Sequence, residues 1–159
     1  MNTLILCTAF ENTALPKHSM NNISVVEAKI SSIKKYLSLL ERYKPYSQND
    51  IEQNPDLKGA FERYLYLAAQ ATIDLAEAVI AFKDFRRPTT YADAFYILDE
   101  QDFIPKPLSE KLVNMAKFRN IIAHDYEDVD FGIVYDAGQN RLIDIEELIT
   151  VVRQKLNLN

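Results

Sequence analysis

Glycine, cysteine and histidine are scarce in this chain, and each scarcity excludes a class of structure. Three glycines in 159 residues are too few for the many tight turns of a β-rich domain, and frequent Leu, Ala, Glu and Lys favour helices. The single cysteine, Cys7, excludes an intrachain disulfide and is typical of a protein from a reducing compartment. Two histidines and one cysteine also leave no cluster with the ligand spacing of a zinc site.

Basic residues are fewer than acidic ones: the chain has 18 Lys and Arg residues and 23 Asp and Glu residues, which gives a net charge of -5. Such a surface does not attract nucleic acid as a whole, so any contact with RNA requires a local basic cluster. The apolar run at residues 4–10 is too short to span a bilayer and lacks a basic segment before it. The chain also has no glycine-rich phosphate loop and no dinucleotide fingerprint. We therefore expect a cytoplasmic protein with no membrane association, no metal and no cofactor.

Apolar residues recur at helical spacing in four long stretches, which predicts an all-α fold. The first stretch opens with Ser24 and Glu27, spaced as a capping box, and fades before Pro45. Asp144 is the predicted cap of the last stretch, and residues 46–56 are predicted to be a polar connection. We predict main helices over 24–44, 57–83, 107–126 and 144–156, and short helices over 90–99 and 130–137, the last ending before Gly138.

No repeat or linker divides the chain, so the simplest architecture is an up-and-down bundle of four main helices with short helices attached. Residues 1–21 precede the first strong helix signal. We expect an N-terminal appendage there, either poorly ordered or the product of an upstream start, with Met20 as the true start. Residues 22–159 then form one domain, which is long enough to bury a core.

The residues that could carry chemistry gather near the end of the predicted helix 107–126, in the sequence KFRNIIAHDY. Asn120 and His124 are four residues apart and share one helix face with Lys117. Arg119 and His124 are five apart, or about 140° around an ideal helix. These two side chains therefore meet only if the helix ends or bends between them, or if a second subunit brings its own copy alongside.

This set of side chains suits cleavage of an RNA phosphodiester. Histidine titrates near neutral pH, so it can move a proton to or from the 2′-hydroxyl or the leaving oxygen. Arginine grips phosphate oxygens through two N–H groups as charge builds, while asparagine orients the phosphate or fixes the histidine tautomer. No metal is required when the 2′-hydroxyl is the nucleophile. On spacing alone, His124 also fits a surface histidine, Arg119 a helix-end cap, and Lys117 either a weak RNA contact or a solvated lysine.

The stretch from Lys117 to Tyr126 resembles the R-x4-H-x-Y signature of the HepT family. These proteins are toxins of the HEPN superfamily, paired with an MntA-type nucleotidyltransferase antitoxin. Similar order and spacing continue through residues 62–76, 86–95 and 129–135. The resemblance covers the chain from about residue 22 to the C-terminus.

The resemblance implies an all-α, HEPN-type helical bundle and a homodimer whose two R-x4-H motifs face each other in a cleft. It implies a metal-independent endoribonuclease acting on tRNA or mRNA, with Arg119 and His124 catalytic and Asn120 supporting them. It also implies that the antitoxin adds AMP to Tyr126, where extra bulk and negative charge would repel RNA phosphates. The alternative role of Tyr126 is that of a helix-end aromatic packed on the core.

Two other functions remain open. A non-catalytic HEPN subunit that binds a nucleotidyltransferase partner or a nucleotide would use the same motif for recognition, and a plain dimerising bundle would have no active site. Changing His124 separates the ribonuclease from the partner-binding subunit, because it would abolish RNA cleavage and spare partner binding. Acidic residues crowd the motif, so a ribonuclease needs compensating positive charge, for which the sequence offers Lys106, Lys111, Lys117, Arg86 and Arg87.

Overall fold

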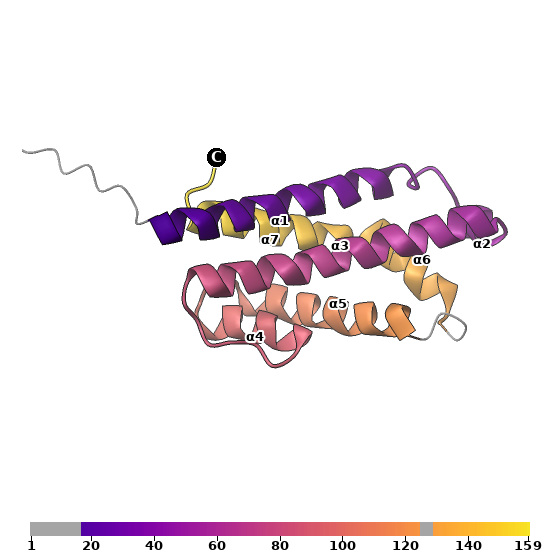
Figure 1. Ribbon diagram of the computed structural model, residues 1–159. Coiled ribbons are helices and arrows are strands. Elements are labelled where there is room, and N and C mark those ends of the chain that lie inside the picture. The colour runs from indigo at the N-terminus through magenta and orange to yellow at the C-terminus, as the bar shows by residue number, and fades with distance from the viewer. Residues whose placement is uncertain (1–16, 125–128) are drawn as a thin grey trace, which may run out of the picture.

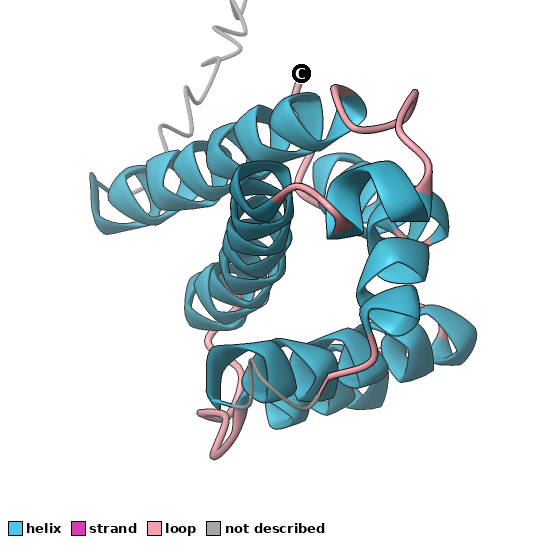
Figure 2. Cartoon of the chain, turned by 90° about the vertical axis from the view of Figure 1, so that its right-hand side faces the viewer, coloured by secondary structure: helices cyan, strands magenta, loops and turns pink. Residues whose placement is uncertain are grey.

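The computed structural model describes residues 17–124 and 129–159, and within them the chain forms helices and no strand (Figure 2). The all-α prediction is therefore confirmed. The predicted division into an appendage, 1–21, and a domain, 22–159, stays a prediction. In chain order the helices are α1 (Lys17–Glu41), α2 (Gln48–Glu52), α3 (Pro55–Phe82), α4 (Tyr91–Glu100), α5 (Lys106–His124), α6 (Phe131–Asn140) and α7 (Leu142–Lys155) (Figure 1).

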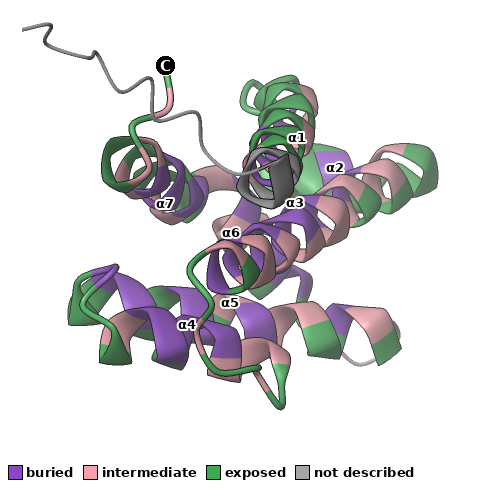
Figure 3. Ribbon diagram, turned by 60° about the vertical axis from the view of Figure 1, so that its left-hand side comes forward, coloured by how far each residue is buried: buried purple, intermediate pink, exposed green. Residues whose placement is uncertain are grey.

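The long helix α3 forms the centre of the fold, where α1, α4 and α5 all pack against it. Antiparallel to it lies α1, while α4 packs along α5 (Figure 1). The buried faces of the helices turn toward one another (Figure 3). The predicted apolar stripe of α1 is confirmed as buried: Val26, Ile30, Ile33, Leu37 and Leu40. On α3 the predicted inward positions are buried too, apart from a half-buried Phe82: Phe61, Leu65, Ala68, Thr72, Leu75 and Val79.

By length and composition, α3 is also apolar enough to cross a membrane, with a mean hydropathy of 1.4 over its best window. However, 61% of that window is buried inside the bundle. Its exposed side carries charge, since Asp74 forms an ion pair of 3.1 Å with Lys29 of α1. Its apolar character is that of a core helix.

Two helix starts differ from the prediction. No glycine or proline interrupts the stretch between Pro16 and Ser24, so the first helix begins at Lys17 and the predicted start at Ser24 is wrong. The predicted polar connection 46–56 contains the short helix α2 instead. Its capping box is formed by Ser47, whose Oγ accepts from the Asp50 N–H at 3.2 Å while the Asp50 carboxylate accepts from the Ser47 N–H at 2.9 Å.

The last two helices also differ from the prediction, because Gly138 does not end a helix. It lies inside α6, and the ring of Phe61 occupies the place where a Cβ atom of residue 138 would be. Helix α7 then starts at Leu142, directly after Arg141, and not at a cap formed by Asp144. Asp144 lies in the first turn of α7 and forms an ion pair of 3.1 Å with Lys111. Glycine at 138 therefore serves close packing rather than chain reversal.

We expect Gly138→Ala to destabilise the fold by about 1–3 kcal/mol, because the new methyl group overlaps the fully buried Phe61 ring. The matched control is Gly59→Ala in α3, where nothing lies within 4 Å of the added Cβ. There the higher helix propensity of alanine should stabilise the protein by about 0.5–1 kcal/mol. Urea unfolding followed by circular dichroism measures both changes. Stabilisation by both substitutions would contradict the role assigned to Phe61.

Candidate active site

Helix α5 carries the motif on its last turns. One face of the helix is anchored in the core by Leu108, Leu112, Ala116 and Ile122, all buried. This anchoring leaves Lys117, Asn120 and His124 exposed and Arg119 half-buried. Lys117, Asn120 and His124 were predicted to share one helix face, and all three are exposed on α5. Tyr126 lies outside the described residues.

A single chain does not bring Arg119 and His124 together. Helix α5 is continuous through both positions, so their Cα atoms are separated by about 140° around the axis and about 7.5 Å along it. Among the described residues no hydrogen bond joins the two side chains. The bend or helix end that could have united them within one chain is absent between these positions.

Arg119 is held between two tyrosines from other helices. Its Nη2 donates a hydrogen bond of 2.7 Å to the hydroxyl of Tyr66 on α3. Its guanidinium carbon lies 4.8 Å from the ring centroid of Tyr66 and 4.9 Å from that of Tyr91 on α4. Both distances are in the range of cation–π attraction. On the third side, Nη1 donates to the Oδ1 of Asn120 at 3.2 Å, so Asn120 contacts the arginine rather than the histidine.

These contacts use two of the five N–H donors of Arg119. Its Nε is buried and has no hydrogen-bond partner within the described part of the chain. A buried donor without a partner costs free energy, and the same burial keeps this Nε out of reach of a ligand that arrives from solvent. The guanidinium is therefore fixed in place, and its contacts with a ligand would go through the remaining N–H groups of its Nη atoms.

Sequence reasoning assigned no role to Tyr66 or Tyr91. Tyr91 belongs to the segment 86–95 that carries part of the family resemblance, but nothing in its spacing relates it to Arg119. Tyr66 is one of two tyrosines on α3, and nothing in the sequence distinguishes it from Tyr64. The Tyr66 ring also lies 5.3 Å from the guanidinium carbon of the exposed Arg63. Two arginines thus flank Tyr66, which adds Arg63 to the basic side chains near the motif.

A hollow of about 310 Å³ opens beside Asn120 and Tyr91, with Thr89 and Thr90 along its wall. Glu77 of α3 also lines it. Burial raises the pKa of the Glu77 carboxyl, as does the nearby charge of Asp74, and both outweigh the opposite effect of Lys29. The hollow therefore presents hydroxyl, amide and carboxyl groups next to the motif.

Tyr91 is placed by a cluster of charges at the start of α4. The carboxylate of Asp93 accepts two hydrogen bonds from Arg86, at 2.8 and 2.9 Å, and one from the backbone N–H of Thr89 at 2.9 Å. Arg86 also pairs with Glu100 at 3.0 Å. Arg86 is thus neutralised by α4, just as Lys111 is by Asp144. Neither of these two residues supplies free positive charge to the motif.

We expect Asp93→Asn to lower the free energy of unfolding by about 1–2 kcal/mol at pH 7, because charge-assisted bonds at the start of α4 are lost. The hydrogen bonds from Arg86 lower the pKa of Asp93 to about 2. A carboxyl whose pKa falls on folding stabilises the protein above its unfolded pKa near 4, and this contribution disappears as the pH falls through about 2.

The difference in the free energy of unfolding between Asp93→Asn and wild type should therefore be largest at pH 7 and should shrink between about pH 4 and pH 2. Urea unfolding across this range measures it. Asp99→Asn on the same helix is the control and should change stability by less than about 0.5 kcal/mol. A difference between Asp93→Asn and wild type that did not vary with pH would contradict the charge-based explanation.

Comparison with known proteins places the chain in a family. Residues 33–152 match the family described as "Ribonuclease HepT-like". The chain belongs to this family. The mRNA nuclease HepT of Shewanella oneidensis is 30% identical over 135 residues, covering 84% of this chain and 98% of that protein. The tRNA nuclease HepT of Aphanizomenon flos-aquae is 26% identical over 120 residues, covering 74% and 82% respectively.

The fold agrees with this assignment. A solved structure of the tri-AMPylated Shewanella oneidensis HEPN toxin in complex with the MNT antitoxin has a TM-score of 0.64 to this chain at 27% identity. The match covers 88% of this chain and 99% of the toxin. The predicted HepT-family membership and HEPN-type bundle are confirmed.

Proposed function

We propose that this HepT-like chain is the toxin of a HepT/MntA-type pair, and that it cleaves tRNA or mRNA without a metal in a cleft between two copies. The observation that carries the proposal is the complete motif Arg119–x4–His124–x–Tyr126, whose described residues lie at an accessible helix end in a member of a ribonuclease family. Arg119, Asn120 and His124 are the proposed active-site residues. The chain acts in the cytoplasm, where its RNA substrates are.

A homodimer would supply what one chain lacks. If the ends of two α5 helices face each other, Arg119 and His124 from both copies can border the same cleft. Ile121, between Asn120 and the buried Ile122, is 47% exposed. A large apolar side chain in this position is typical of a surface covered by a partner. The exposed isoleucine therefore supports a dimer contact next to the motif.

The proposed reaction is an internal transesterification. His124 of one copy takes the proton of the 2′-hydroxyl, whose oxygen forms a bond to phosphorus while the bond from phosphorus to the 5′-oxygen breaks. The protonated His124 of the second copy gives its proton to the departing 5′-oxygen. Arg119 stabilises the charge on the non-bridging oxygens through the N–H groups of its Nη atoms that Tyr66 and Asn120 do not use. The products are a 2′,3′-cyclic phosphate and a 5′-hydroxyl.

The tyrosine pair around Arg119 makes this charge stabilisation effective. Because Tyr66 and Tyr91 already fix the guanidinium, little reorganisation is needed when charge develops on the phosphate. Arg63 and the exposed Lys117 would provide the phosphate attraction that Arg86 and Lys111 cannot. Lys117 is a weak RNA contact in this arrangement.

Incubation of purified wild-type protein with total tRNA and with a synthetic message, in EDTA, tests the proposal. We expect cleavage, with product ends carrying cyclic or 3′-phosphate. Cleavage only after magnesium is added would overturn the metal-free mechanism. Mass spectrometry must first establish that Tyr126 carries no AMP. If such unmodified, dimeric protein is folded and still does not cleave RNA, the non-catalytic partner-binding subunit replaces the ribonuclease as the conclusion.

We expect Tyr66→Phe to lower kcat about tenfold and to change KM little, because Arg119 loses a charge-assisted hydrogen bond that matters most as charge builds on the phosphate. Tyr64→Phe is the matched control, since the Tyr64 ring packs near Tyr43 on another side of α3. It should leave both constants near wild type. A rise in KM at constant kcat for Tyr66→Phe would show that Tyr66 binds RNA and does not position Arg119.

A further inference from the structure

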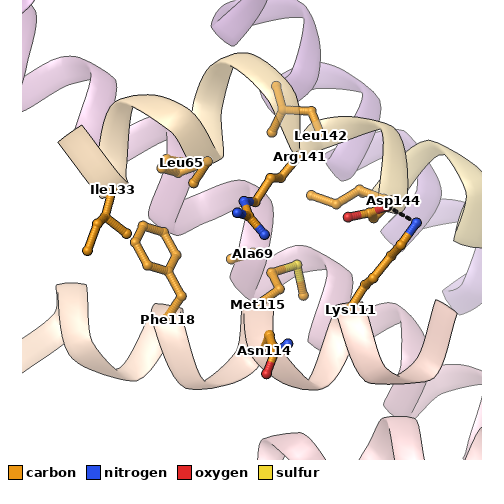
Figure 4. Close-up of a pocket in the computed structure, with 12 residues that line it drawn as sticks. Leu65, Ala69, Lys111, Asn114, Met115, Phe118, Ile133, Arg141, Leu142 and Asp144 are labelled. Carbon is orange, nitrogen blue, oxygen red and sulfur yellow. Dashed lines mark ion pairs between the residues drawn. The ribbon is translucent and has the colours of Figure 1, made fainter. Parts of the chain in front are cut away.

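A second cavity, of about 340 Å³, lies between α3, α5, α6 and α7 (Figure 4). Helix α5 contributes Met115 and Phe118 to it, on a face different from the one that presents Asn120 and His124. Leu65 and Ala69 of α3 line it as well, and α6 and α7 add Ile133, Ala137, Leu142 and Ile145. This volume is within the range of small-molecule pockets, and apolar walls with a few polar groups are typical of such sites.

The polar groups of this cavity differ in how far they are already paired. Lys111 is neutralised by Asp144 across 3.1 Å. Arg141 reaches into the cavity from the junction of α6 and α7 (Figure 4). Its Nε is bound to Asp136 at 2.8 Å, but within the described residues its two Nη atoms have no hydrogen-bond partner. The Arg141 side chain is 70% exposed and forms an ion pair with Asp136, so its free Nη donors lie at the open edge of the cavity, beside the apolar walls.

We propose that this cavity binds a small amphipathic anion, with an apolar body against Met115, Phe118 and Leu65 and a carboxylate or similar acidic group on Arg141. A guanidinium with free Nη donors matches such a group through two hydrogen bonds. A cationic ligand would find no free carboxylate, because Asp144 is already paired with Lys111. The site lies apart from the RNA-cleavage motif, and the proposal does not depend on the proposed ribonuclease activity.

Fluorescence titration with 8-anilinonaphthalene-1-sulfonate, whose aromatic body carries one negative charge, tests the site. We expect saturable binding of one probe per chain, displaced by octanoate but not by octylammonium. Arg141→Gln should weaken binding of both anions about tenfold, which corresponds to about 1.4 kcal/mol. The matched control is Arg153→Gln, a cation on α7 that borders a different hollow, beside α1. It should leave the affinity unchanged.

Two variants that fill the cavity from opposite walls locate the binding. Ala69→Leu and Ala137→Leu each place an isobutyl group in the space, so each should abolish saturable binding while the helical circular dichroism stays that of wild type. Wild-type affinity in both folded variants would overturn the proposed location. Displacement by octylammonium as strong as by octanoate would overturn the preference for anions. No saturable binding to folded wild type would overturn the site itself.

Discussion

His124→Ala is expected to lower the rate of RNA cleavage about 10³-fold or more. General acid–base catalysis by one positioned side chain contributes about 10²–10⁴-fold, and the homodimer would lose a histidine from each copy. The fold should survive, because His124 is exposed at the last position of α5. We therefore expect the free energy of unfolding of His124→Ala to lie within about 0.5 kcal/mol of the wild-type value, and this measurement serves as the control. Cleavage near the wild-type rate would remove His124 from the reaction.

Arg119→Ala tests the other half of the motif, with an expected loss of about 10²–10³-fold in kcat. Arg119→Lys should recover only a small part, because an ammonium group keeps the charge but cannot stack between two rings and hydrogen-bond at once. Arg63→Gln is the comparison, because the Arg63 guanidinium also contacts the Tyr66 ring but does not lie between Tyr66 and Tyr91. That change should mainly raise KM, by a few-fold. A kcat of Arg119→Lys equal to that of wild type would mean that only the positive charge at this position matters.

Several parts of this structure follow from local sequence patterns. The apolar stripe of α1 and the inward face of α3 were predictable, because helical periodicity determines which residues share a face. The short helix predicted over 90–99 is α4, and Thr90 caps it by accepting from the Asp93 N–H at 3.0 Å. That Lys117, Asn120 and His124 share one helix face also followed from their spacing. In each case the deciding contacts lie within a few residues along the chain.

Features that depend on distant residues were not predictable. Tyr66 and Arg119 are 53 positions apart, and their hydrogen bond exists only because α3 packs against α5 in one particular register. Gly138 was predicted to follow a helix end. The reason for a glycine there is the ring of Phe61, which lies on another helix and leaves no room for a Cβ atom. The pairing of Arg86 with Asp93 and Glu100 likewise removed a cation that the sequence alone leaves available. Side-chain partners across helices determine which charges and rings serve the site.

Tyr126→Phe is expected to prevent inactivation by the nucleotidyltransferase antitoxin while RNA cleavage continues. In the proposed modification, the phenol oxygen of Tyr126 forms a bond to the α-phosphorus of ATP, pyrophosphate leaves, and the phenolic proton passes to solvent. The AMP ester would place a negative charge two residues from His124, where RNA phosphates must approach. The solved HEPN toxin similar to this chain is tri-AMPylated and in complex with its MNT antitoxin, which supports the same modification here.

Transfer of labelled AMP from ATP, in the presence of the nucleotidyltransferase, measures this modification. Wild type should gain label and lose nearly all RNA cleavage, whereas Tyr126→Phe should gain none and keep its activity. Tyr96→Phe is the control, because Tyr96 is 44% exposed on α4 and offers a comparable phenol elsewhere on the surface. That variant should be labelled and inactivated like wild type. Labelling of Tyr126→Phe would place the AMP on another side chain. Labelled wild type that still cleaves RNA would mean that charge at this position does not block the cleft, and that the antitoxin acts by covering it.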